Sequence, residues 1–103
     1  MRRLIVRPEA EADITNAAIW HESREPGLGL KFLADIQQAI IGAIHDPRAF
    51  LLLRKNPEVR RILAKRFPYR VFFILRADVL VVFAGFMPAD TTESGGTGSR
   101  GRD

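Results

Sequence analysis

The sequence predicts an α+β fold, in which an N-terminal strand and an αα-hairpin pack on a small antiparallel β-sheet. The first half of the chain carries two adjacent segments whose apolar residues recur every three or four positions, which is the spacing of amphipathic helices. The second half carries short runs rich in Val, Ile, Leu and Phe, which is typical of strands. At 103 residues, the chain has the size of one domain.

The first half is expected to form a strand and two helices. Arg2–Arg7 is a short β-capable segment, and it stops at Pro8 because proline cannot donate to a ladder. A helix with a narrow stripe of small residues is predicted over Pro8–Arg24, since proline suits a first helical turn. A second helix with a wide apolar stripe is predicted over Leu28–His45, where Asp46-Pro47 ends it.

The second half is expected to add three strands after a connector over residues 48–57. Within that connector, residues 50–53 are either an apolar anchor or a further strand. Strands are predicted over Val59–Arg66, Tyr69–Arg76 and Val79–Phe86.

The chain is expected to divide into a folded domain and a tail. Residues 1–86 would form the domain. Residues 87–103 are mostly Thr, Ser, Gly and charged residues, which cannot bury a face, so a flexible polar tail is predicted.

The strand over Tyr69–Arg76 is apolar on both faces. Val71, Phe73 and Leu75 would face one side, and Phe72 and Ile74 the other. The αα-hairpin can cover one side. Either a partner chain or second copy covers the other, or the chain curls enough to cover it itself.

Composition excludes several classes of function. Cysteine is absent, which removes disulfides, Cys-ligated zinc and thiol catalysis. No apolar run approaches the roughly 20 residues of a membrane span, so we expect a cytoplasmic chain with no membrane partner. No His/Asp/Glu cluster has ligand spacing, and we expect neither a metal nor another cofactor.

The net positive charge of the chain comes from one stretch of the sequence. Residues 54–76 carry eight basic side chains and one acid, a net charge of +7, whereas the whole chain carries +4. Arginine forks match carboxylates bidentately, and apolar residues border the arginines, so this stretch suits an acidic, partly apolar peptide. It equally suits phosphate. The alternative is a solvated strand whose charges prevent edge-to-edge aggregation.

The residues expected to bind a partner are mostly those of this basic stretch. Trp20 is added as an aromatic anchor; we expect it to contact the connector around Phe50, with a partner contact as the alternative. The predicted binding residues are Arg60, Arg61, Lys65, Arg66, Tyr69, Arg70 and Trp20.

Catalysis is a second interpretation of the same stretch. Metal-free RNA cleavage needs a base, an acid and cations at the phosphorane, and Lys65 with Arg60 and Arg61 could supply some of these. Arginine is a poor base because it stays protonated. His21 and His45 lie on the predicted helices, where we interpret them as a partly buried or surface residue and a helix-end cation. A binding protein is therefore favoured over an enzyme.

The order and spacing of several short motifs resemble the ParE branch of the RelE/ParE superfamily, the toxins of bacterial type II toxin–antitoxin modules. The resemblance covers about residues 4–86. The motifs are Pro8-Glu9-Ala10 with Asp13-Ile14 and Trp20, Gly27-Leu28-Gly29 with Phe32, Asp46-Pro47, Val59-Arg60-Arg61, and Arg66-Phe67-Pro68-Tyr69-Arg70-Val71.

The resemblance implies a helical hairpin packed on an antiparallel sheet. It also implies a toxin neutralised by a ParD-like antitoxin, whose C-terminal segment wraps it. ParE-like members imply DNA gyrase as the target, and RelE-like members imply messenger RNA on the ribosome.

The chain departs from the family pattern after its last predicted strand. Many relatives continue with a His- and Arg-bearing segment and a short helix, whereas here residues 85–88 lead straight into the polar tail. A third possibility is therefore a relic that still binds an antitoxin but has no target activity.

Overall fold

The structure is a computed structural model, which describes residues 2–88. The helical hairpin consists of α1 (Pro8–Arg24) and α2 (Leu28–His45), with the bounds that the sequence predicted. A 3-10 turn, η1 (Pro47–Ala49), follows α2. Because residues 89–103 lie outside the described part, the predicted tail remains a prediction.

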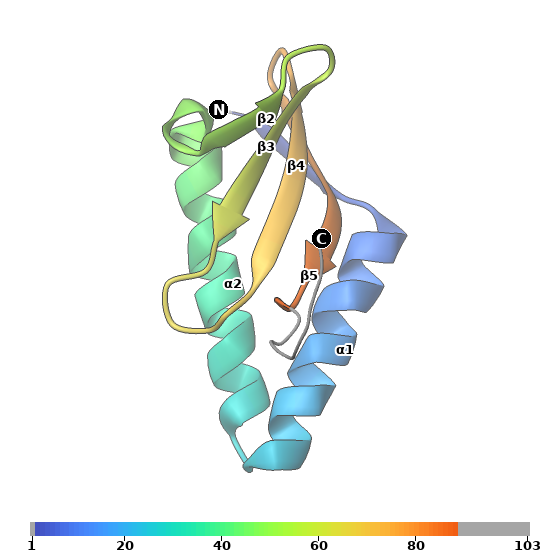
Figure 1. Cartoon of the computed structure of the whole chain (residues 1–103), viewed down its shortest axis with the longest axis vertical. Helices are drawn as coiled ribbons and strands as arrows, with labels where there is room; N and C mark the ends of the chain where they lie inside the picture. The colour runs from blue at the N-terminus through green and yellow to red at the C-terminus, as the bar shows by residue number, and fades with distance from the viewer. Residues whose placement is uncertain (1, 89–103) are drawn as a thin grey trace.

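Five strands form one sheet in the order β1-β5-β4-β3-β2 (Figure 1). They are β1 (Arg3–Val6), β2 (Leu51–Arg54), β3 (Glu58–Leu63), β4 (Arg70–Arg76) and β5 (Val79–Phe86). Neighbouring strands from β2 to β5 run antiparallel, whereas β1 pairs with β5 in parallel. The sheet is thus mixed but mostly antiparallel.

Strand bounds differ from the sequence prediction around β3. This strand ends at Leu63 and not at Arg66, and residues 64–69 form a loop. Asp35 of α2 explains where the loop lies, because its Oδ2 accepts the backbone N–H groups of Arg66 (2.9 Å) and Phe67 (3.0 Å). The apolar run at residues 51–53 belongs to strand β2, the edge of the sheet.

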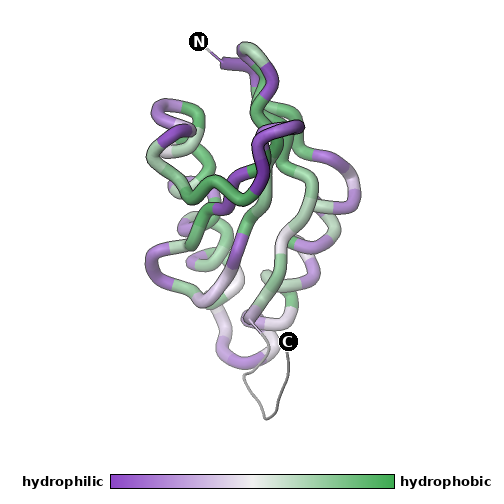
Figure 2. The backbone as a smooth tube through the Cα atoms, turned by 45° about the horizontal axis from the view of Figure 1, so that its top comes forward, coloured by the Kyte–Doolittle hydropathy of each residue, from purple (hydrophilic) through white to green (hydrophobic). Residues whose placement is uncertain are grey.

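The core lies between the hairpin and one face of the sheet. Alternation along β4 buries Val71, Phe73 and Leu75, and the small-residue stripe of α1 buries Ala10, Ala17 and Ala18. From α2, Phe32, Ile36, Ile40 and Ala43 complete the core. In Figure 2 the strands are largely green between purple turns, as two-sided apolar strands require.

Within residues 2–88, no helix is both long and apolar enough to cross a membrane, and no group of three or more His, Asp or Glu side chains could hold a metal ion.

Candidate binding surfaces

The face of the sheet opposite the helices is a candidate binding surface, which we call the outer face. Residues directly opposite each other on neighbouring strands share a face, so the register identifies its members. Phe72 and Ile74 of β4 point to this face, as predicted, and they are only partly buried. None of the outer-face residues of β3, β4 and β5 belongs to the core cluster or packs against it. The described part of the chain therefore does not cover this face.

The centre of the outer face is apolar and aromatic. One row pairs Ile74 with Val59 on one side and Val81 on the other. Next to it, the ring of Phe72 lies 6.3 Å from that of Phe83 and 5.6 Å from that of Phe86, centroid to centroid. Exposed Leu51, Leu63 and Phe86 extend the apolar area toward one end.

Arginines stand in and around this apolar area. Arg61 of β3 pairs with Phe72 and Leu51, so it lies on the outer face among apolar residues. Its Nε is buried and has no hydrogen-bond partner within residues 2–88. A buried donor without a partner costs about 1–3 kcal/mol, so a carboxylate arriving at Arg61 would recover that penalty.

The ends of the outer face are also cationic. Arg76 and Arg3 both pair with Val79 at one end, where Arg54 pairs with Val59, and Arg70 pairs with Phe86 at the other. Arg54, Arg70 and Arg76 belong to the basic stretch that the sequence indicated, but only Arg70 was among the predicted binding residues, and Arg3 lies outside the stretch. Their shared face is visible only once the strand register is known.

The structure removes Arg60 from the exposed basic surface. Arg60 lies on the opposite face of β3 from Arg61, with its Nε 2.7 Å from Glu58 Oε2. Its Nη1 donates to the backbone oxygens of Phe50 (2.7 Å) and Arg48 (3.3 Å). Its side chain is 11% exposed, so Arg60 joins the connector to the sheet and its guanidinium is already satisfied.

The other predicted binding residues divide into exposed and buried ones. Lys65, Arg66 and Arg70 are exposed, the first two on the loop that Asp35 holds. Tyr69, by contrast, is 2% exposed, and its ring packs edge-on against Phe32 with centroids 5.0 Å apart. Tyr69 is therefore a core residue.

Trp20 lies elsewhere than predicted. The expected contact with the connector is wrong, because Phe50 packs on Phe73, with ring centroids 6.4 Å apart, beside the far end of α2. Trp20 is 46% exposed and has the guanidinium carbon of Arg24 5.0 Å from its ring centroid. It remains available to a partner.

His21 is a core residue of the hairpin. Its ring centroid lies 4.9 Å from those of Phe32 and Phe67 and 5.0 Å from that of Trp20, and its Nε2 has no partner within the described residues. Burial lowers the pKa of His21 below its usual value. The buried, aromatic setting explains why it takes no part in the basic surface.

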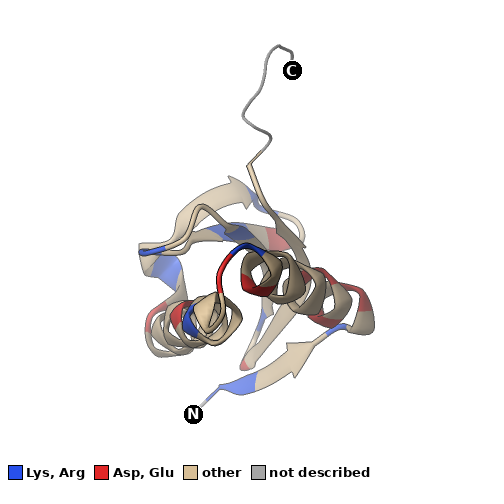
Figure 3. Cartoon of the chain, turned by 90° about the horizontal axis from the view of Figure 1, so that it is seen from below, with Lys and Arg blue, Asp and Glu red and all other residues tan. Residues whose placement is uncertain are grey.

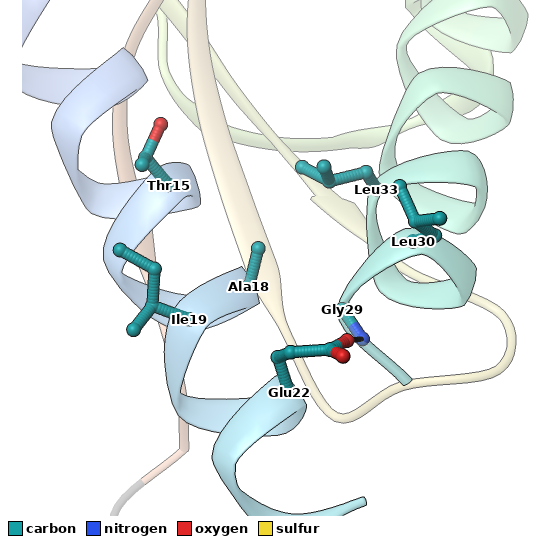
Figure 4. A pocket seen from close by; sticks show the side chains of 7 residues that line it. All are labelled: Thr15, Ala18, Ile19, Glu22, Gly29, Leu30 and Leu33. Atoms are coloured by element: carbon teal, nitrogen blue, oxygen red, sulfur yellow. Dashed lines mark hydrogen bonds between the residues drawn. The ribbon is translucent and has the colours of Figure 1, made fainter. Parts of the chain in front are cut away.

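A second apolar surface is the groove of about 360 Å³ between the two helices (Figure 4). Exposed Ile19 and Leu30 form its rims. Glu22 accepts the N–H groups of Gly27 and Gly29, which lowers the pKa of its carboxyl and caps the start of α2. Glu22 is thus engaged in the turn between the helices.

The fold is similar to that of a known toxin–antitoxin structure. A chain of the "Chromosomal ParDE TA system from P. aeruginosa" aligns with a TM-score of 0.66 and 20% sequence identity, over 84% of this chain and 96% of that chain. No protein-family model matches the sequence, and no curated protein matches it either. At this identity the likeness establishes the fold, and it is the fold that the sequence motifs implied.

Proposed function

We propose that this chain is the toxin of a type II toxin–antitoxin module and that a ParD-like antitoxin neutralises it in the cytoplasm. The observation that carries the proposal is the outer face, an apolar sheet surface that residues 2–88 leave uncovered and that contains Arg61. The likeness to a ParDE chain supports it.

The chemistry of the outer face selects an acidic, partly apolar segment of the antitoxin. Apolar side chains would lie on Phe72 and Ile74, and a carboxylate would pair with Arg61. A second copy of the chain carries the same positive face, so its approach is electrostatically opposed.

A ribonuclease is less well supported than a binding toxin. It would need Lys65, Arg60 and Arg61 to act together. Arg60 and Arg61 lie on opposite faces of β3, and Arg60 is held by Glu58. Gyrase is accordingly the target that we propose, on the resemblance to ParE.

The first experiment is induced expression with and without the antitoxin. Growth arrest with loss of DNA supercoiling, relieved by the antitoxin, is expected. Growth arrest with intact supercoiling and cleaved messenger RNA would identify RNA, and not gyrase, as the target. Absence of arrest, with the antitoxin still bound, would identify a relic.

The second experiment locates the antitoxin. Arg61→Glu is expected to weaken the complex by more than about 10-fold, because it puts a like charge opposite the antitoxin's carboxylate. Lys31→Glu, an equal charge change on the exposed side of α2, is the matched control and should change the affinity little. Calorimetry measures the affinity of both variants for the antitoxin. Equal losses of affinity would reject the outer face as the antitoxin surface.

A further inference from the structure

A pocket between α1 and the end of β5 has the features of a separate binding site. It is open to solvent and has a volume of about 360 Å³. Its residues are Asp13, Asn16, Ala17 and Trp20 of α1 with Tyr69, Gly85, Phe86 and Met87. The four α1 residues recur at spacings of three and four, so they share one side of the helix.

The floor of the pocket carries a polar atom without a partner. Tyr69 is 2% exposed, yet its hydroxyl makes no hydrogen bond to any described residue. Gly85 makes room for it, because a Cβ there would lie 2.8 Å from Tyr69 Cζ. A buried hydroxyl is ordinarily paired, so its position here points to a ligand group that pairs with it.

Among the described residues, the only charged one that lines the pocket is an acid, Asp13. Asp13 Oδ2 accepts the N–H of Gly85 at 3.1 Å, and no described cation forms an ion pair with Asp13. Among the described residues, none donates to the other carboxylate oxygen, so that atom could accept from a ligand. Burial and then the charge of Asp13 raise the pKa of Tyr69 to about 12, which agrees with a negative local potential.

The walls of the pocket are apolar and aromatic. Trp20 is 46% exposed, and Met87, which directly follows β5, packs against the core. Phe86 borders the pocket, while its ring contacts Phe72 of the outer face. Arg24 already lies over the Trp20 ring, which demonstrates that this ring accepts a guanidinium. Figure 3 shows Asp and Glu mainly along the helices and Lys and Arg mainly on the strands and loops, so the electrostatics here differ from those of the outer face.

We propose that this pocket binds an arginine side chain of a partner protein. The methylene stem would lie along Trp20 and Met87, and the guanidinium would donate to Asp13 and to the Tyr69 oxygen. Phe86 borders both this pocket and the outer face, but the two sites differ in charge, so the pocket takes a partner segment of the opposite charge.

The test is a titration of the purified full chain with the capped peptide Gly-Arg-Gly, followed by the fluorescence of Trp20, the single tryptophan. Saturable binding with a Kd of about 1–10 mM is expected for one side chain. The same peptide with citrulline, which keeps the shape but not the charge, should bind at least about 10-fold more weakly. Equal binding of the two peptides, or none of either, would overturn the proposal.

Two matched variants locate the site. Asp13→Asn should weaken binding at least about 10-fold, while its amide oxygen can still accept from Gly85 and keep the fold. Glu11→Gln removes an equal charge from an exposed position of α1 outside the pocket and should bind as the parent does. Similar losses of peptide affinity in both variants would show that general surface charge causes the binding, and they would reject the pocket.

Two further readouts refine the result. Arg24→Gln removes a like charge beside the pocket, so binding of the arginine peptide should tighten. If free L-arginine binds more than about 10-fold more tightly than the capped peptide, the ligand of the pocket is a small molecule and not a protein. Neither result depends on whether an antitoxin binds the outer face.

Discussion

At the scale of single residues, neighbours in the sequence have opposite tasks. Arg60 and Arg61 look alike in the sequence, but the alternation of β3 sends them to opposite faces. Arg60 is held by a carboxylate and two backbone oxygens, whereas Arg61 keeps a buried Nε without a partner in the described chain. One stabilises the fold and the other is available for binding.

This difference predicts a separation of stability from affinity. Arg60→Gln is expected to lower the free energy of unfolding by about 1–3 kcal/mol, because it leaves Glu58 and the connector oxygens without their donor. Arg61→Gln should not lower the free energy of unfolding, because the Arg61 Nε has no partner to lose within the described residues, and it should weaken the antitoxin complex. Urea unfolding and calorimetry on the same two variants measure both quantities. An Arg60 variant of unchanged stability would contradict the assignment.

At the scale of elements, two carboxylates of the helices, buried Asp35 and exposed Glu22, hold the loops between elements. Asp35 of α2 fixes the loop after β3, and Glu22 of α1 fixes the start of α2. Both act on backbone N–H groups that would otherwise have no partner inside the fold. The loop that carries Lys65 and Arg66 is thus positioned from the helix layer and not from the sheet.

Asp35→Ala is therefore expected to loosen the loop at residues 64–69. It removes an acceptor that two backbone donors share, which should cost about 2–3 kcal/mol. Hydrogen exchange at the Arg66 and Phe67 amides should accelerate more than exchange in β4. Asp46→Ala, at an exposed position beyond α2, is the control. Unchanged protection of both amides would show that other contacts hold the loop.

At the scale of the whole molecule, one sheet separates two environments. Helices cover its inner face and build the core, while the outer face keeps its aromatic residues and arginines at the surface. The aromatic cluster around His21 lies on the core side, where α1, α2 and the loop after β3 meet. Protonation of His21 therefore affects the stability of the entire domain.

Stability should fall as the pH falls from 7.5 to 5.5. The pKa of His21 is lower in the folded chain than its usual value of 6.5. As the pH falls through 6.5, His21 therefore takes up a proton more readily in the unfolded chain than in the folded chain. The melting temperature should therefore decrease across this range. In His21→Phe the dependence should largely disappear, whereas His45→Gln, at the exposed second histidine, should keep it. A slope that persists in His21→Phe would assign it to other groups.

The sequence by itself determined both helices of this protein and the apolar strands β4 and β5. Helix bounds followed from Pro8, from the apolar spacing and from Asp46-Pro47, because these signals act within a few residues. Alternation in β4 likewise indicated two apolar faces, since successive side chains of a strand point to opposite sides. The motif order implied the ParDE-like fold that the solved chain shares.

Only the tertiary structure decided which of those residues can meet a partner. Strand register placed Arg60 inside and Arg61 outside, and packing buried Tyr69, although the sequence grouped all three. Asp13 belonged to a family motif but was not predicted to line a site, because acids in the first turns of a helix normally match its dipole. Its pocket forms only where α1 meets the end of β5, more than 70 positions along the chain. The local sequence pattern determines whether a segment forms a helix or a strand, whereas the exposure of a side chain depends on contacts between distant segments.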